Sequence, residues 1–192
     1  PKCGIPFNSD AGEDHLCGIC LTSKVHFNKA RAVGFFEGVL QEAIHQFKYN
    51  KKILLAKPLG DFMVNCNRDS IDLKAYDFLV PVPLRPRMVS KDHKLKALSL
   101  AKRIAKRCGV PVDYLSLKRV RWEKPQINLS RKERERNVRG AFAFHDRGKL
   151  SKNRVLLIDD VCTSGATVNE CARVLMEAGT RRVDVLTLCR AL

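Results

Sequence analysis

The segment at residues 155–167, which reads VLLIDDVCTSGAT, constrains this fold more than any other part of the chain. Four consecutive apolar residues at 155–158 predict a strand buried on both faces, as in a parallel sheet covered by helices. The small residues that follow predict a tight turn into a helix over 166–178, which Gly179 would end. A strand that passes through a short turn into a helix is the repeating unit of a parallel α/β sheet.

The turn in this segment carries groups that suit a phosphorylated ribose. Asp159 and Asp160 come at the carboxyl end of the strand, where ligands bind in open α/β sheets, and carboxylates can accept hydrogen bonds from ribose hydroxyls. The helix N-terminus offers N–H groups and hydroxyls that can cradle a phosphate. This phosphate loop consists of Thr163, Ser164, Gly165, Ala166 and Thr167. The alternative is an Asp-Asp turn with an ordinary Ser/Thr helix cap.

The rest of the chain alternates between helical and strand patterns. Helices are predicted where apolar residues recur every three or four positions, at 39–47, 53–64 and 95–105. Strands are predicted at short apolar runs, at 77–83, 114–120, 141–144 and 183–188. Residues 121–139 show no convincing period of either kind. Strands that alternate with helices predict an α/β fold with a doubly wound parallel sheet.

Composition and charge narrow the classes of partner. The 192 residues carry a formal net charge of +16, which indicates polyanionic partners such as phosphates or nucleic acid, the alternative being a solvated basic surface. No stretch reaches the roughly 18 apolar residues that span a bilayer, and the N-terminus has no apolar signal core. We therefore expect a soluble, cytoplasmic protein without membrane insertion. It would consist of a Cys-rich segment at 1–28 and a main domain at 29–192.

Three of the eight cysteines lie within the first 20 residues. Cys3 and the C-x-x-C pair of Cys17 and Cys20 look like three-quarters of a zinc ribbon. The candidates for the fourth ligand are water, His15 and His26. The alternative to a metal site is three free thiols. The other cysteines are scattered through apolar segments, which fits a reducing compartment better than a disulfide framework.

Several segments of the chain together resemble the ComF family, named after competence protein F, with its related GntX proteins. They read FKYNKK at 47–52, VPVPLRP at 80–86, KPQINLSRKERERNVRGAF at 124–142, VLLIDDVCTSGATVNECARVLMEAG at 155–179 and LTLCRAL at the C-terminus. The first part of the fourth segment is also similar to the phosphoribosyl-pyrophosphate (PRPP) signature of type I phosphoribosyltransferases. The resemblance implies a type I phosphoribosyltransferase fold, with a central parallel sheet flanked by helices and a small N-terminal zinc-ribbon-like segment.

The resemblance also implies further ligands. ComF proteins usually carry a C-x-x-C pair where this chain has Cys3, so its first cysteine would fall just before Pro1, and we expect the chain to be truncated by a few residues. In type I phosphoribosyltransferases the turn after the first core strand holds pyrophosphate, with Mg²⁺ bound to it. Here Arg85 and Arg87 follow that strand and can pair with pyrophosphate oxygens, and Lys48 is a weaker candidate. The alternative is a proline-rich loop with solvated arginines.

Residues 118–139 hold nine basic residues against three acidic ones, where the family has a flexible catalytic loop. Such a loop can close over PRPP and exclude water. Its aromatic and arginine side chains also suit a nucleic acid, by stacking on bases and by following the phosphate backbone. The alternative is a solvated charged hairpin. The residues concerned are Trp122, Lys124, Arg131, Arg134, Arg136 and Arg139.

Two functions remain open at this point. The resemblance implies a PRPP-binding protein that acts in DNA uptake during competence and handles single-stranded DNA, with a DNA-uptake helicase as a partner. The alternative is an active phosphoribosyltransferase that transfers phosphoribose from PRPP to a base or an amine in nucleotide metabolism. Steeply salt-dependent binding of single-stranded DNA would favour the first, and turnover of PRPP the second.

Overall fold

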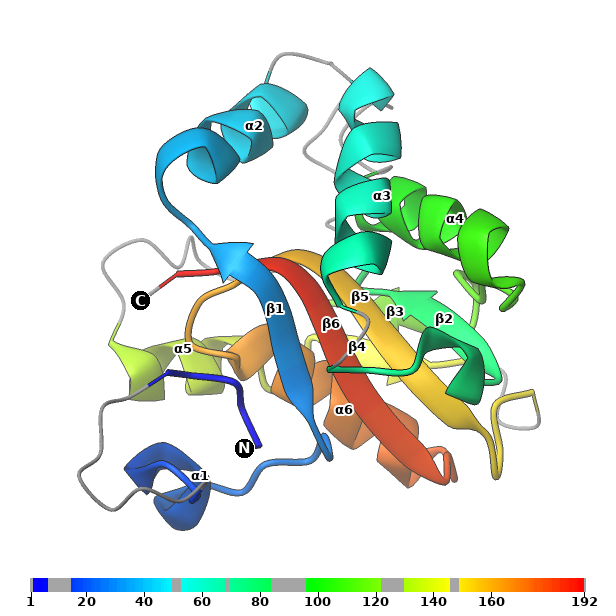
Figure 1. Cartoon of the computed structure of the whole chain (residues 1–192). Helices are drawn as coiled ribbons and strands as arrows, with labels where there is room; N and C mark the ends of the chain where they lie inside the picture. The colour runs from blue at the N-terminus through cyan, green and yellow to red at the C-terminus, as the bar shows by residue number, and fades with distance from the viewer. Residues whose placement is uncertain are drawn as a thin grey trace.

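A parallel sheet forms the centre of the protein in a computed structural model (Figure 1). The structure describes residues 2–6, 15–49, 53–67, 70–83, 96–121, 130–145 and 149–191. The sheet has four strands in the order β1-β6-β5-β2, and every neighbouring pair is parallel. Its strands are β1 (Ala30–Phe35), β2 (Phe78–Pro81), β5 (Arg154–Cys162) and β6 (Arg182–Arg190).

The two central strands, β5 and β6, are apolar because both of their faces are covered. Alternate residues of each strand point to opposite sides, so Leu156 and Leu186 join one core cluster, while Leu157 and Val185 join the other. All four of these side chains are fully buried. The predictions of strands at 155–158 and 183–188 are therefore confirmed, and both strands extend further than predicted.

Helices α3 (Ala56–Cys66) and α4 (Lys96–Cys108) cover one face of the sheet. Gly60 lets them approach closely, because a Cβ at this position would lie 2.7 Å from the Cβ and Cγ of Arg103. Helix α2 (Gly38–Tyr49) follows β1 beyond the carboxyl edge of the sheet (Figure 1). These three helices confirm the helical periods predicted from the sequence, although residues 53–55 form a short 3₁₀ turn rather than the start of α3.

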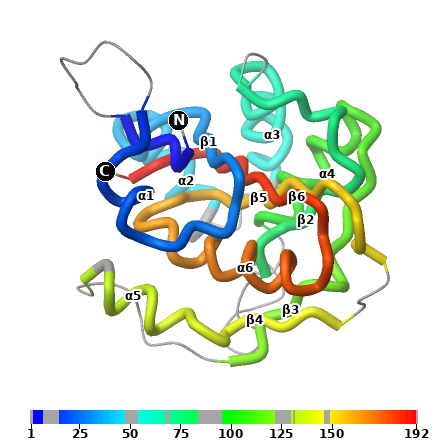
Figure 2. The backbone as a smooth tube through the Cα atoms, turned by 90° about the horizontal axis from the view of Figure 1, so that it is seen from below, coloured from blue at the N-terminus to red at the C-terminus, as the bar shows by residue number. Residues whose placement is uncertain are grey.

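Helix α6 (Ala166–Glu177) covers the opposite face, and Gly179 ends it with a φ of 92°, as predicted. A small antiparallel pair, β3 (Leu117–Arg119) and β4 (Phe142–Phe144), lies outside α6 together with α5 (Arg131–Val138) (Figure 2). The molecule therefore has four layers in the order α3 and α4, sheet, α6, and the α5–β3–β4 unit.

One strand and two α-helices were not predicted. The strand β1 and the five-residue helix α1 (Gly18–Thr22) lie in regions to which the sequence analysis assigned no helix or strand. Helix α5 lies within the charged segment for which no period was found. A capping box, in which Ser130 and Glu133 each bond to the other's backbone N–H, starts this helix. This signal was readable in the sequence, but no apolar stripe accompanies it.

Among the described residues, no helix is both long enough and apolar enough to span a membrane. The N-terminal segment packs onto the main domain, since Cys3 and Phe27 belong to the same core cluster as Leu157. The boundary between 28 and 29 stays a prediction.

A buried carboxylate fixes the segment that leads into β3. Asp113 accepts hydrogen bonds from the Ser116 hydroxyl at 2.8 Å and from the N–H groups of Ser116 and Leu115, and its Oδ2 lies 2.8 Å from the Lys149 ammonium. Burial raises the pKa of this carboxyl, but these donors outweigh burial and lower the pKa below its ordinary value.

Asp113 should therefore contribute to acid sensitivity. Because its folded pKa is lowered, its contribution is complete above the ordinary carboxyl pKa near 3.8 and is lost as the pH falls through the folded value. Asp113→Asn should lower the free energy of unfolding at neutral pH by about 2–3 kcal/mol and flatten its fall in acid, as measured by urea unfolding across pH. The exposed Glu177→Gln serves as the control, and equal acid slopes in Asp113→Asn and wild type would contradict the assignment.

Candidate functional site

The segment at residues 155–167 forms most of β5, a short loop and the start of α6 (Figure 1). Asp159 and Asp160 are half-buried near the carboxyl end of β5, as predicted. The Asp160 N–H donates to the Asp159 carboxylate at 2.9 Å, and the Val161 N–H donates to the Asp160 carboxylate at 2.7 Å. These contacts orient both carboxylates locally, at the edge of the sheet where ligands bind in this class of fold.

The phosphate loop turns through Gly165, which is the N-cap of α6 and has a φ of 80°. This left-handed conformation strains any residue with a Cβ, so the turn requires glycine. Thr163 is exposed, while Ser164 and Thr167 are half-buried. The first turn of α6 contains no acidic residue, so the positive end of the helix dipole is not neutralised from within the helix. The loop therefore has the backbone form and the electrostatics that an anion requires.

A cavity of about 640 Å³ borders this loop. Ser164, Gly165 and Ala166 line one side of it. The N-terminal segment lines another side through Cys3 and Cys20, while α5 contributes Lys132 and Arg139 follows at its end. The structure thus brings together three regions that the sequence had marked separately. Of the basic residues predicted as ligands in the charged segment, Arg139 lines the cavity, while Arg134 is half-buried and Arg136 is exposed.

Arg190 also lines this cavity, and the sequence analysis missed it. It is the last residue of β6 and only 4% exposed. Its Nη1 donates to the carbonyl of Cys3 at 2.8 Å and contacts the Cys162 thiol at 3.5 Å, while its buried Nε has no hydrogen-bond partner among the described residues. The available signal was an arginine at the carboxyl end of the strand, directly after the mainly apolar run at 185–189.

Cys162 stands next to Arg190 across the β5–β6 pair. Burial raises the pKa of its thiol, and the nearby Arg190 cation and the Gly165 N–H only partly offset this effect. A protonated, buried thiol is inert. The burial and the raised pKa of Cys162 therefore do not favour a role as a nucleophile.

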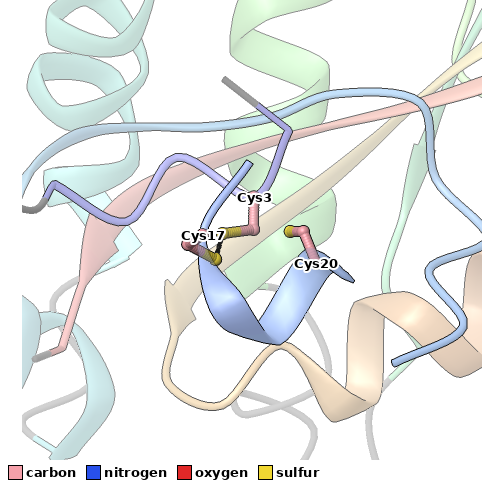
Figure 3. Close-up of side chains that lie close together, drawn as sticks. All are labelled: Cys3, Cys17 and Cys20. Atoms are coloured by element: carbon pink, nitrogen blue, oxygen red, sulfur yellow. Dashed lines mark hydrogen bonds between the residues drawn. The ribbon is translucent and has the colours of Figure 1, made fainter. Parts of the chain in front are cut away.

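The three N-terminal cysteines converge as predicted, and we call them the cysteine cluster (Figure 3). The sulfur atoms of Cys3, Cys17 and Cys20 all lie within 4.8 Å of one another, and those of Cys3 and Cys17 are 3.4 Å apart. Four sulfurs at the usual Zn–S bond length of about 2.3 Å would lie about 3.8 Å from one another, so the arrangement fits a metal ion. His15 and His26, although described, do not belong to this cluster.

The thiols of the cysteine cluster already differ in acidity. Burial raises the pKa of Cys17, but hydrogen bonds from the Cys20 backbone and from the other two thiols outweigh burial and lower it. Burial, together with Cys3 and Cys17, raises the pKa of Cys20 to about 11. A cation bound here would remove the remaining thiol protons, because thiolates are the form that ligates metals.

Arg85, Arg87, Trp122 and Lys124 lie outside the described residues, as do the side chains of Lys48 and Arg131. Their roles stay predictions.

Arg190→Ala should loosen the N-terminal segment. It removes the donor to the Cys3 carbonyl, so the free energy of unfolding should fall by about 2–3 kcal/mol. Amide exchange at Ala30, whose N–H donates to the Lys2 carbonyl, should speed up in hydrogen-exchange measurements. Arg181→Ala, an exposed arginine near the other end of β6, serves as the control. Wild-type exchange at Ala30 in Arg190→Ala would show that this contact does not hold the segment.

Comparison with known proteins identifies the family. Residues 95–192 match the model of the phosphoribosyl transferase domain. The chain is 30% identical over 196 residues to DNA utilization protein YhgH of Salmonella typhi, covering 100% of this chain and 84% of that protein. It is 28% identical to competence protein F of Haemophilus influenzae, covering 91% and 78% respectively.

A solved structure supports the fold alone. Glutamine phosphoribosylpyrophosphate amidotransferase from B. subtilis, complexed with ADP and GMP, superposes with a TM-score of 0.50 at 21% identity over 76% of this chain and 30% of that one. Together with the loop geometry, these findings show that the chain belongs to the phosphoribosyltransferase domain family and, within it, to the family of competence protein F and YhgH.

Proposed function

We propose that this protein binds PRPP with Mg²⁺ at the carboxyl edge of its sheet and handles single-stranded DNA during DNA uptake. The observation that carries the proposal is the paired carboxylates beside a glycine-capped helix N-terminus, at the end of β5. The relatives' names, which mention competence and DNA utilization, supply the biological setting.

In this proposal Asp159 and Asp160 accept hydrogen bonds from the ribose hydroxyls. The N–H groups and hydroxyls of residues 163–167 hold the 5′-phosphate, whose charge the α6 dipole favours. Arg85 and Arg87, with Lys48, pair with the pyrophosphate, and Mg²⁺ neutralises part of its charge. The half-buried positions of the two carboxylates support this assignment, because burial strengthens their hydrogen bonds to a ligand.

For DNA, we assign the backbone contacts to the charged segment at 118–139, which includes α5. The net charge of +16 supports a polyanionic partner. Arg134, Arg136 and Arg139 lie on α5 or at its end, next to the cavity at the phosphate loop. Trp122 would stack on bases, while Lys124 and Arg131 would extend the basic track. A DNA-uptake helicase as partner stays a prediction, and so does transfer of phosphoribose to a base or an amine.

Asp160→Asn should weaken PRPP binding. Losing the charge of a carboxylate that accepts from ribose hydroxyls should lower the affinity for PRPP with Mg²⁺ by roughly 10–150-fold in calorimetric titration. Asp72→Asn is the matched control, because asparagine can still cap the short helix that Asp72 precedes.

The same variant separates the two ligands. Asp160→Asn should bind single-stranded oligonucleotide as wild type does, since the proposed DNA contacts lie on other residues. Loss of both activities would mean one shared site, and unchanged PRPP affinity in both Asp159→Asn and Asp160→Asn would refute the ribose assignment.

We further propose that the cysteine cluster holds zinc. Cys17→Ser should remove bound zinc, measured by plasma mass spectrometry on protein purified without chelator, since two thiolates alone make an incomplete site. Cys66→Ser, at an exposed cysteine on α3, should keep the zinc of wild type. The same zinc content in Cys17→Ser as in wild type would argue against this site.

A further inference from the structure

A second cavity lies at the opposite edge of the sheet from the phosphate loop. It measures about 540 Å³ and borders the amino-terminal ends of β5 and β6. In Figure 1 these strand ends lie at the lower right, whereas the loop between β5 and α6 follows the other end of β5. We call the second cavity the rear basic cavity. Its basic lining residues are Lys2, His26, Arg154, Arg181 and Arg182, and no acidic residue lines it in the part of the chain that the structure describes.

One buried acid positions an arginine of this cavity. Asp184 is fully buried and accepts from the Arg182 Nε at 2.6 Å, from the Tyr76 hydroxyl at 2.8 Å and from the Asn28 amide at 3.1 Å. The structure assigns the terminal nitrogens of Arg182 no hydrogen bond among the described residues. Arg182 is thus fixed at one nitrogen and keeps donors for an incoming acceptor.

Tyr76 and Asp184 together also position a second arginine. The Arg154 guanidinium lies over the Tyr76 ring, 5.7 Å from its centroid, and the Tyr76 hydroxyl is bonded to Asp184. Stacking on an aromatic ring restricts a guanidinium without using its N–H donors. Arg154 and Arg182 are therefore held around one Tyr76–Asp184 unit, as in a site organised before its ligand arrives.

The charges in the rear basic cavity do not balance. Asp184 neutralises Arg182, while Lys2, Arg154 and Arg181 have no acidic partner among the described residues. Cations gathered in a concave surface repel one another and attract an anion. The remaining lining is mainly apolar, with Val25, Phe27, Met176 and Val183 beside the amide of Asn28. Cationic and apolar walls together suit a phosphate that carries a sugar and a base.

The basic surface continues beyond the cavity. The N–H of Lys152 donates to the Gly179 carbonyl and the N–H of Arg181 donates to the Asn153 carbonyl, so two turns lie side by side. Lys152 and Arg181 are both exposed. A strand with successive phosphates matches a basic track of this kind better than a single small anion does.

We propose that the rear basic cavity binds the phosphate backbone of single-stranded nucleic acid. This inference rests on the proposed nucleic-acid function and adds a contact that is separate from α5. The rear basic cavity and the phosphate loop lie at opposite edges of the sheet. The protein can therefore hold a nucleic-acid strand in the cavity while PRPP occupies the loop.

The test compares two double variants that each remove two positive charges. Arg154→Ala/Arg181→Ala alters the rear basic cavity but keeps Arg182, which neutralises Asp184. Lys57→Ala/Lys106→Ala is the matched control, with exposed lysines on α3 and α4. Binding of a fluorescein-labelled oligothymidine is measured by anisotropy over a salt series, and thermal melts verify folding. If Arg154→Ala/Arg181→Ala melts early, Arg181→Ala alone replaces it.

The logarithm of the affinity for a single strand falls with the logarithm of salt by about 0.7 per phosphate contact. Arg154→Ala/Arg181→Ala should therefore bind with a slope about 1.4 less steep than wild type, or about 0.7 for Arg181→Ala alone. The control should keep the wild-type slope. Saturating PRPP with Mg²⁺ should leave the binding of oligothymidine to wild type unchanged.

Each contrary result has its own meaning. Wild type that binds no oligothymidine at any salt overturns the nucleic-acid function and this inference together. Wild-type binding with an unchanged slope in Arg154→Ala/Arg181→Ala overturns this inference alone. Displacement of oligothymidine by equimolar thymidine monophosphate would show a mononucleotide pocket instead of a strand site, and displacement by PRPP would show that the two ligands share one edge.

Discussion

The pairing of β5 with β6 is the constraint on which the rest of the structure depends. Both strands have nine residues, are buried on both faces and run parallel in register from Arg154 beside Arg182 to Cys162 beside Arg190. Their carboxyl ends deliver the paired carboxylates and the phosphate loop, and their amino ends deliver the arginines of the rear basic cavity. Two strands thus determine the separation and the opposite orientation of both candidate sites.

Buried charges on β6 dock the N-terminal segment onto this pair. Asp184 near one end of the strand accepts a hydrogen bond from Asn28, and Arg190 at the other end donates to the Cys3 carbonyl. A charge removed from water destabilises the fold unless polar partners compensate it. These two contacts therefore stabilise the fold and also specify where the N-terminal segment docks. The cysteine cluster therefore reaches the phosphate loop because β6 holds the segment that carries it. A metal ion there would stiffen a wall of the same cavity.

The proposed anion sites of this protein differ in kind. The helix N-terminus at the phosphate loop provides backbone donors, which fit a compact phosphate closely. The rear basic cavity and α5 provide side-chain cations, which tolerate an extended polyanion. The Asp159–Asp160 pair would repel a bare phosphate backbone and would favour a ligand that brings hydroxyl groups. The charge pattern therefore supports the proposed division between a sugar site and a backbone site.

The sequence by itself determined the local units. Residues 155–179 specify a strand, a turn and a helix through an apolar run, small residues and a terminal glycine, all of which act within a few positions of one another. The strand at β6 and the helices α2, α3 and α4 follow from periodicity in the same way. Helix α5 has a readable capping box at Ser130 and Glu133 but no apolar stripe, so periodicity could not find it.

Only the tertiary structure decided which of these units share a site. Arg190 meets Cys3 across 187 positions of the chain, and Tyr76 meets Asp184 across 108. Such contacts depend on strand order and on the packing of helices onto the sheet, which no local pattern encodes. For this reason the sequence showed three separate motifs, namely the phosphate loop, the cysteine cluster and the charged segment. Their convergence on one cavity, the role of Arg190 and the rear basic cavity appeared only once the strands were paired.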